Sequence, residues 1–287
     1  HRRSSAASDV YKRQVYNMFN NIGRNGQTVA TAKDANIKTM ADLKGKRVTW
    51  VKGSPALNGN MAGFLAFGGL TWDDVIKVEV SGYGASANAV INGQADASMG
   101  SSVSSIFNKT NASPRGLFFP PMPHNDEAGW KRAIAVAPHF AKAVVTNFVG
   151  SSDSNKSFEG MNYPYPIFVT MEKTSEDLSY HLTEAVMENY DQFKDSGPGM
   201  DGYQLSNQNF SWIFPYHPGA VKYYKKKGVW TSKHDKHNAN LIKRQDVLAK
   251  AWQKTLKVNL SGDAFKKKWL ENRASALKAA GMPNAYN

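Results

Sequence analysis

The sequence predicts an α/β fold in which the strands of a mostly parallel sheet alternate with helices. Three observations support this prediction. Short apolar runs rich in β-branched residues recur along the chain, stretches with helical spacing lie between them, and glycine-containing turns end several of those stretches. At 287 residues, the chain is long enough to form one large domain or two lobes.

Strands and helices alternate most clearly in the first half of the chain. The run RVTWV at residues 47–51 has the composition of a buried strand, and the helix that follows it ends at the pair Gly68-Gly69. A shorter helix further on is closed by Asn92-Gly93. Predicted strands cover residues 47–51, 77–80, 95–100 and 116–120, and predicted helices cover residues 58–67 and 85–91.

Three helix starts have the spacing of a capping box, in which a Thr hydroxyl and an acidic side chain three residues later each accept a backbone N–H. The third of them opens the clearest amphipathic helix of the chain, which is predicted to run to about residue 195. The extended segment 163–170 just before that helix is predicted to cross from one lobe to the other. The three pairs are Thr39 with Asp42, Thr71 with Asp74, and Thr174 with Asp177.

Positive charge is concentrated at the two ends of the chain. Residues 217–287 carry sixteen Lys and Arg against four Asp and Glu, a net charge of +12, whereas residues 15–216 have a net charge of −2. A nucleic-acid surface spread over the body is therefore not expected. The chain has no cysteine, which excludes disulfides and thiolate metal sites and suits a periplasmic protein.

The first fourteen residues, HRRSSAASDVYKRQ, do not have the apolar run of a signal peptide. They are similar to translated adapter sequence in metagenomic assemblies, and we interpret residues 1–14 as a non-native leader. An ordinary polar terminus is the alternative. On the leader interpretation, nothing about location follows from the missing signal peptide.

Three blocks of sequence carry a family resemblance. Residues 37–56 (IKTMADLKGKRVTWVKGSPA) resemble the segment that opens the second lobe of type II periplasmic binding proteins. Residues 90–100 (VINGQADASMG) contain the Gly-Gln-x-Asp-Ala turn of those proteins. Residues 214–230 (FPYHPGAVKYYKKKGVW) are similar to the signature of the TAXI-type solute receptors of tripartite ATP-independent periplasmic (TRAP) transporters.

The resemblance implies a periplasmic receptor, not an enzyme, that binds without a cofactor. Two α/β lobes would close on a small anionic ligand, a carboxylate or an amino acid such as glutamate. The receptor, a monomer, would then deliver the ligand to the TRAP membrane subunits, which use an ion gradient.

The resemblance also implies that the first lobe is incomplete, because family members carry more chain before the block at residues 37–56. Residues 1–14 would be the leader, 15–36 a remnant of the first lobe, 37–160 the second lobe, 161–230 the hinge crossing and first-lobe helices, and 231–287 basic C-terminal helices.

The strongest candidate for ligand contact is the turn Gly53-Ser54, between a predicted strand and a predicted helix. The first turn of a helix presents unpaired N–H groups and a positive dipole end, which together bind anions. The family has Gly-Ser-Gly-Thr here. This chain has Pro55 and Ala56 in the last two positions, which removes one backbone donor and one hydroxyl. Plain helix capping by Ser54 remains an alternative.

Other candidates follow predicted strands, where open α/β sheets place their ligands. Ser101 and Ser102 come directly after one strand and are also expected to cap the next helix. Tyr83 follows another strand, with turn packing as the alternative. Tyr163 and Tyr165 belong to the predicted crossing and either line the cleft or pack in the hinge.

No metal ligand or catalytic residue is predicted. His217 stands before Pro218 at a helix start and is expected to be structural. His234 and His237 are three residues apart, but only Asp235 among nearby residues is a carboxylate, so both are expected to be ordinary surface residues.

The basic C-terminal region is predicted to form two amphipathic helices that bury an aromatic stripe. Packing helices with solvated lysines is the simplest interpretation. Contact with an acidic membrane subunit or with anionic lipid is an alternative, whereas nucleic acid is disfavoured because the aromatic residues share the apolar stripe. Leu241, Gln245, Leu248 and Trp252 mark one face, and Phe265, Trp269, Ala276 and Leu277 mark the other.

Two other functions stay open from the sequence. An enzyme, a transferase or lyase on the same two-lobed fold, would require a convergent acid–base pair in the cleft. A ligand-sensing regulatory module would require a fused DNA-binding or signalling segment.

Overall fold

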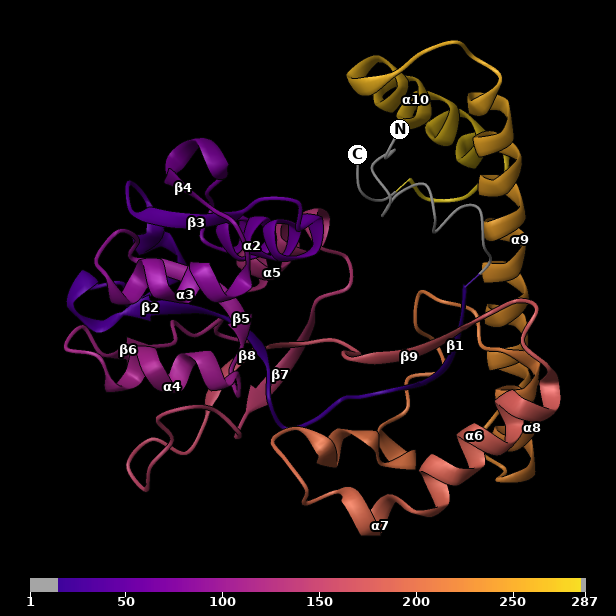
Figure 1. The fold of residues 1–287 in the computed structure, drawn as a ribbon, viewed down its shortest axis with the longest axis horizontal. Helices are drawn as coiled ribbons and strands as arrows, with labels where there is room; N and C mark the ends of the chain where they lie inside the picture. The colour runs from indigo at the N-terminus through magenta and orange to yellow at the C-terminus, as the bar shows by residue number, and fades with distance from the viewer. Residues whose placement is uncertain (1–14, 285–287) are drawn as a thin grey trace. The chain divides into compact units, whose positions relative to one another are not determined.

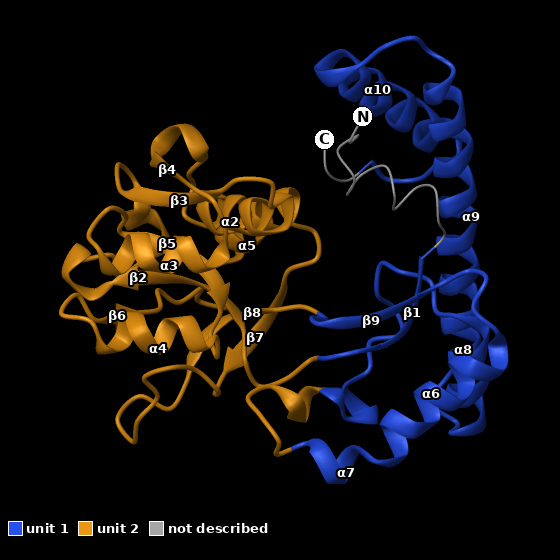
Figure 2. Cartoon of the chain, in the orientation of Figure 1, with its two compact units in different colours: residues 1–21, 164–194, 203–287 blue, residues 22–163, 195–202 orange. Residues whose placement is uncertain are grey.

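The computed structural model describes residues 15–284, so the predicted leader lies outside the described residues. The described chain divides into two compact α/β units (Figure 2). Unit 1 contains residues 15–21, 164–194 and 203–284, and unit 2 contains residues 22–163 and 195–202. The chain therefore passes between the units more than once, and the crossing after residue 163 coincides with the extended segment predicted at residues 163–170.

Unit 2 is built on a seven-stranded sheet with the order β4-β3-β5-β2-β8-β7, in which β6 also pairs with β2 (Figure 1). The predicted strands at 47–51, 77–80 and 95–100 are confirmed within one or two residues, and the strand at 116–120 is shorter because Pro120 and Pro121 cannot donate to a ladder. The strands are β2 (Gln27–Ala32), β3 (Arg47–Val51), β4 (Ile76–Val80), β5 (Ala97–Ser101), β6 (Leu117–Phe118), β7 (Ala141–Val145) and β8 (Phe158–Asn162).

The sheet is mixed, which corrects the expectation of a mostly parallel sheet. β3 pairs in parallel with both β4 and β5, but β2 is antiparallel to β5, β6 and β8, and β7 is antiparallel to β8. Parallel neighbours need a long crossover, usually a helix, whereas the loop between β7 and β8 contains no helix and lets the chain reverse.

Helices cover both faces of this sheet. Alternate residues of β2 point to opposite faces: Val29 joins the core beneath α2 and α5, whereas Ala30 and Ala32 join the cores beneath α3 and α4. Two separate apolar layers therefore hold the sheet in place. The helices are α2 (Pro55–Phe67), α3 (Tyr83–Ile91), α4 (Ser105–Ala112) and α5 (Glu127–Val136).

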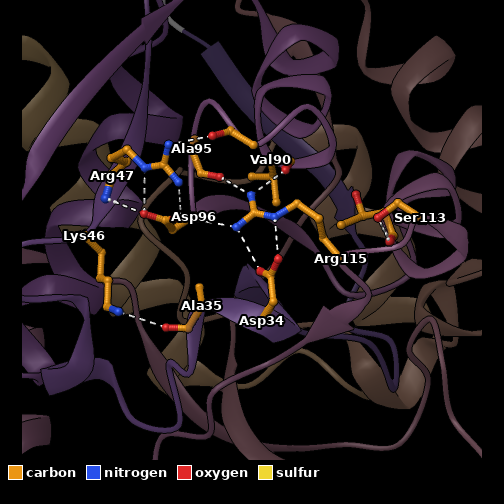
Figure 3. Close-up of polar contacts among 11 residues, drawn as sticks. Asp34, Ala35, Lys46, Arg47, Val90, Ala95, Asp96, Ser113 and Arg115 are labelled. Carbon is orange, nitrogen blue, oxygen red and sulfur yellow. Dashed lines mark hydrogen bonds and ion pairs between the residues drawn. The ribbon is translucent and has the colours of Figure 1, made fainter.

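A network of ion pairs ties together the loops at the edge of the sheet where β3 and β5 begin (Figure 3). The Asp96 carboxylate accepts hydrogen bonds from the Arg47 Nη2 atom at 2.6 Å and from the Arg115 Nη2 atom at 3.3 Å. Arg115 also donates to Asp34 at 2.9 Å. Burial raises the pKa of Asp96, but the hydrogen bonds from Arg47 and Arg115 outweigh it and hold that pKa at about 2.

Unit 1 contains a two-stranded antiparallel sheet, β1 with β9, and a set of helices. Met18 and Phe19 of β1 pack with aromatic residues that include Tyr216, Tyr224 and Trp230. The elements are β1 (Val15–Asn20), β9 (Ile167–Met171), α6 (Glu176–Glu188), α7 (Tyr190–Phe193), α8 (Pro218–Lys226), α9 (Ser232–Leu256) and α10 (Gly262–Ala279). Short 3-10 turns are η1 (Lys33–Ala35), η2 (Met40–Leu43), η3 (Trp72–Asp74), η4 (Met200–Tyr203) and η5 (Leu205–Asn207).

Within the segment 15–36, β1 belongs to unit 1, whereas β2 pairs with β5 in the middle of the unit 2 sheet. One local expectation is corrected. The capping boxes at Thr39 and Thr71 are present, but α6 is capped one residue later than predicted. Ser175 accepts the Leu178 N–H, while the Thr174 hydroxyl is bonded to that of Thr170.

The C-terminal helices α9 and α10 pack against each other through the predicted aromatic stripe. Trp252 and Trp269 meet edge to face, with 5.0 Å between their ring centroids, and Leu248 and Leu277 are buried beside them. Among residues 15–284, none of the helices is both long and apolar enough to span a membrane.

Candidate functional site

One edge of the unit 2 sheet collects the ends of four strands. β3, β4 and β5 run in parallel, so their C-terminal ends lie at the same edge. β8 is antiparallel to β2, which is antiparallel to β5, so β8 also ends there. We call this the C-terminal edge. It is opposite the edge that holds the Asp96 network, because that network lies where β3 and β5 begin.

Six of the seven predicted ligand residues lie at the C-terminal edge. Each follows or ends one of the four strands: Gly53 and Ser54 after β3, Tyr83 after β4, Ser101 and Ser102 at β5, and Tyr163 after β8. Tyr165 belongs to unit 1, where its side chain is 55% exposed and its N–H donates to the Asn21 carbonyl at 2.9 Å.

Three helices begin at the C-terminal edge, and their first turns have no side-chain cap. The N-cap residues of α2, α3 and α4 are Ser54, Gly82 and Ser104, and none of them accepts a hydrogen bond through its side chain. By contrast, α5 is capped by Asp126, which accepts the Gly129 N–H at 2.8 Å. Three first turns without side-chain caps at one edge place N–H donors and three positive dipole ends together.

The turn from β3 into α2 has room for a hydrogen-bond acceptor that does not belong to the chain. Gly53 has a φ of 71°, the left-handed region that favours glycine, and a side chain there would meet nothing within 4 Å. Pro55 at the first helical position has no N–H to donate, so the first-turn donors are the amides of Ala56 and Leu57. The Ser54 hydroxyl makes no cap hydrogen bond with these amides. The structure therefore does not support plain helix capping by Ser54, the alternative interpretation.

Asn58 fixes this turn, although sequence reasoning did not select it. Its side chain accepts the Val51 N–H and donates to the Val51 carbonyl, both at 2.9 Å. The last residue of β3 is therefore joined to the second turn of α2 through two buried hydrogen bonds. Asparagine is a poor helix former, so its presence inside a helix was the available signal.

Ser102 is used by the fold itself. Its buried hydroxyl donates to the Asn147 carbonyl at 2.8 Å and accepts the Gly26 N–H at 3.1 Å. These bonds join β5 to two neighbouring loops, so Ser102 is not proposed as a ligand contact. Ser101 is half-buried, and its hydroxyl accepts from the Asn25 side chain at 3.2 Å. The N-cap position of α4 is Ser104, which makes no cap hydrogen bond, so neither Ser101 nor Ser102 caps that helix as expected.

Tyr83 lies over the end of β5. A Cβ built on Gly100 would clash with the Tyr83 hydroxyl oxygen and come within 2.9 Å of the Phe107 ring. Gly100 therefore lets the phenol lie directly on the strand, and Tyr83 is half-buried.

Tyr163 takes part in a polar cluster with the buried Asn60 and the half-buried His139. The Asn60 side chain donates to the Tyr163 hydroxyl and contacts the His139 Nε2 atom, both at 2.7 Å. Because the amide oxygen can only accept, His139 carries its proton on Nε2. Burial lowers the pKa of His139 to about 4, so the ring is neutral near pH 7. Neither Asn60 nor His139 has a sequence motif that marks it.

His217 has the structural role expected of it, whereas His234 and His237, expected to be ordinary surface residues, are half-buried and hydrogen-bonded to the backbone. His217 is buried and caps α8 by accepting the Gly219 N–H, and His237 contacts the Trp212 carbonyl at 2.8 Å. His234 is half-buried and caps α9 through the Thr231 N–H. In the part of the chain that the structure describes, no three His, Asp or Glu side chains gather as a metal site would require.

A pocket of about 340 Å³ in unit 2 is separate from the predicted residues. Phe118, Phe119, Phe148 and Phe158 line it together with Lys33 and Asn111, near β6 and the end of α4. None of the seven predicted ligand residues lines it.

The groups at the C-terminal edge are better suited to hydrogen bonding with a ligand than to proton transfer. Lys52, beside Gly53, forms an exposed ion pair with Glu79 at 2.8 Å, and His139 is held neutral. Amide N–H groups, the Ser54 and Ser101 hydroxyls and the Tyr83 and Tyr163 phenols are the groups present. Together they suit the binding of a small anion.

Comparisons with known proteins identify relatives for most of the chain. The model of the NMT1-like family matches residues 13–228. A search of curated proteins found no match.

Several solved solute-binding proteins resemble the chain. The alkanesulfonate-binding protein SsuA from Xanthomonas axonopodis pv. citri bound to MOPS is 16% identical, with 86% of this chain and 68% of that chain covered and a TM-score of 0.37. An ABC transporter periplasmic binding protein from Brucella ovis with glutathione bound is 13% identical, with 65% and 50% covered and a TM-score of 0.35. The L-cystine solute receptor of Neisseria gonorrhoeae is 20% identical, with 42% and 53% covered and a TM-score of 0.26.

These likenesses are limited in extent. The match spans about half the length of the Brucella and Neisseria proteins. All three identities are below 25% and all three TM-scores are below 0.5, so none of them assigns a ligand to this chain.

Proposed function

This chain belongs to the NMT1-like family, and from that premise we propose that it is part of a solute receptor that captures a small anion at the C-terminal edge of unit 2. One observation carries the proposal. Three consecutive strand–helix turns leave their helix N-termini without side-chain caps at that edge. Such N-termini bind anions through unpaired N–H groups and the helix dipole.

In the proposed mode of binding, the anion lies at the first turn of α2. The N–H groups of Ala56 and Leu57 donate to it, and the Ser54 hydroxyl supplies a further donor. Gly53 keeps the approach open, since nothing lies within 4 Å of where its side chain would be. Ser101, Tyr83 and Tyr163 are the proposed polar contacts from neighbouring strands of unit 2.

The finer identity of the receptor is also a proposal. The block at residues 214–230 is similar to the TAXI signature, which supports a periplasmic, monomeric receptor that delivers a carboxylate or an amino acid such as glutamate to TRAP membrane subunits. Pro55 and Ala56 depart from the family loop, so we place ligand selectivity at this turn.

The test blocks the first turn of α2 without harming the helix. Ala56 is exposed at the second helical position, where an acidic side chain stabilises a helix. We therefore expect Ala56→Asp to keep or slightly raise Tm while its carboxylate repels the ligand. Affinity for succinate or L-glutamate, measured by isothermal titration calorimetry, should fall by on the order of tenfold or more.

Two controls make the result specific. Ala56→Asn has nearly the same shape without the charge and should retain most of the affinity, and neutral succinamide should not bind the parent protein. Equal losses in the Asp and Asn variants would contradict an anion site at this turn. Unchanged affinity in Ala56→Asp would also contradict it.

A further inference from the structure

Helix α9 carries a row of exposed lysines at a regular spacing. Lys236, Lys243, Lys250 and Lys257 follow one another at intervals of seven residues, and all four are exposed. Lys257 is the C-cap residue of α9 and keeps right-handed helical dihedral angles, so the row continues to the end of the helix. We call these four residues the lysine ladder.

The helix geometry places the ladder on one face. Seven residues make about 20° less than two full turns, so the three steps from Lys236 to Lys257 stay within an arc of about 60°. Each step rises about 10.5 Å, and the whole ladder is about 31 Å long. Figure 1 shows α9 as one continuous helix with α10 folded back along it. Lys254 also falls on the ladder face.

The apolar side of α9 faces elsewhere. Leu248, Trp252 and Thr255 are buried, and their positions around the helix are more than about 90° from the ladder. They pack on α10, with Trp252 against Trp269 and Thr255 bonded to Asn272 at 2.9 Å. The contact that holds the two helices together therefore leaves the ladder face uncovered.

The ladder lysines form no ion pair with the described residues, unlike those of α8, although the exposed Asp246 lies three residues after Lys243 and four before Lys250. Lys225, Lys226 and Lys227 form ion pairs with Asp235, Glu184 and Glu188 at 2.9, 3.1 and 2.9 Å. Over residues 15–284, no carboxylate lies within ion-pair distance of a ladder lysine. Neighbouring ladder lysines are spaced at about the Debye length of physiological salt, roughly 8 to 10 Å, so their fields add along the helix.

We propose that the lysine ladder docks on the surface of a lipid bilayer that contains anionic phospholipids. A straight row of lysines in line along a helix can touch a planar surface all at once. Each lysine is a compact, mobile point charge that can follow a fluid layer of headgroups, and the attraction needs no shape complementarity.

A folded protein partner fits the ladder less well. Protein interfaces depend on apolar or aromatic anchors at their centre, and the aromatic residues of this hairpin are used between α9 and α10. Nucleic acid is disfavoured for the same reason, since no aromatic ring is interleaved with the lysines as a stacking platform.

The docking is independent of the proposed receptor function. The family match ends at residue 228, whereas the ladder begins at residue 236. Its residues lie in unit 1, and the proposed anion site lies in unit 2. Vesicle binding and solute binding can therefore succeed or fail separately.

The test is vesicle co-sedimentation of the whole chain. We expect binding to vesicles of phosphatidylcholine mixed with phosphatidylglycerol, none to pure phosphatidylcholine, and a steep loss as salt is raised. Reversal of the ladder (Lys236→Glu, Lys243→Glu, Lys250→Glu and Lys257→Glu) should lower the vesicle partition coefficient on the order of 100-fold or more.

A matched variant separates the ladder from net charge. Lys44, Lys109, Lys131 and Lys173 are exposed elsewhere in the chain, and reversing these four changes the net charge equally. That variant should keep most of its vesicle binding, and circular dichroism should show both variants folded. No binding to anionic vesicles, or equal losses in the two variants, would overturn the proposal.

Discussion

The ionisation of His139 should be the easiest to detect as a pH dependence of the free energy of unfolding. Its pKa is lowered to about 4 by burial, against 6.5 for an ordinary histidine. The unfolded chain therefore binds more protons than the folded chain between these values. The stabilisation by neutral His139 is complete above about pH 6.5 and is lost as the pH falls toward 4.

We expect this loss to be about 1 to 2 kcal/mol, after allowance for the partial exposure of the ring. His139→Gln keeps a donor for the Asn60 oxygen but cannot titrate. Urea unfolding at pH 7 and pH 4.5 should show that the stability of the parent protein falls more than that of the variant. A difference of the same size in both proteins would exclude His139 as the source.

At the scale of elements, the Asp96 network joins the loops before β3, β5 and β6. The Asp96 side chain is 11% exposed, whereas that of Asp34 is 54% exposed. Breaking a buried ion pair leaves a charge without its partner, so Asp96→Asn should cost about 3 kcal/mol in the free energy of unfolding.

Asp34→Asn is the matched control for this network. It removes a carboxylate that also bonds Arg115, but from an exposed position, and should cost about 0.5 to 1 kcal/mol. Chemical denaturation at neutral pH measures both changes. Equal costs would mean that burial of the Asp96 pair does not matter.

The elements that sequence predicted correctly share strong local signals. β3 is a short run rich in β-branched residues, and Thr39 and Thr71 occupy capping boxes that form as predicted. Where two residues competed for the same role, the local pattern was insufficient. Thr174 and Ser175 both fit a helix start, and the bond between Thr174 and Thr170 decided in favour of Ser175.

The candidate site was predictable only in part. Residues after strands could be selected because strand ends in α/β sheets collect at one edge. The roles of Asn58, Asn60 and His139 could not, because their partners Val51 and Tyr163 are set by packing and not by spacing. Ser102 shows the opposite case. Its hydroxyl lies at the C-terminal edge as predicted, but it is hydrogen-bonded to the backbone of Gly26 and Asn147, which are far from it in the sequence.

At the scale of the whole molecule, the two strands of the segment 15–36 belong to different units. The short strand β2 has little apolar alternation, and only its pairing with β5 and β8 shows that it belongs to the unit 2 sheet. Strand direction was missed for the same reason. Whether neighbours are parallel depends on long-range connections that no local pattern encodes.

The central claim is that an anion binds at the uncapped helix starts of unit 2, and amide NMR tests it most directly. Titration of the ¹⁵N-labelled chain with succinate should shift the first-turn amides of α2, those of Ala56 and Leu57, with smaller shifts at the starts of α3 and α4. The same titration with succinamide should leave them in place. Shifts confined to other parts of the chain, or equal shifts with both compounds, would contradict the claim.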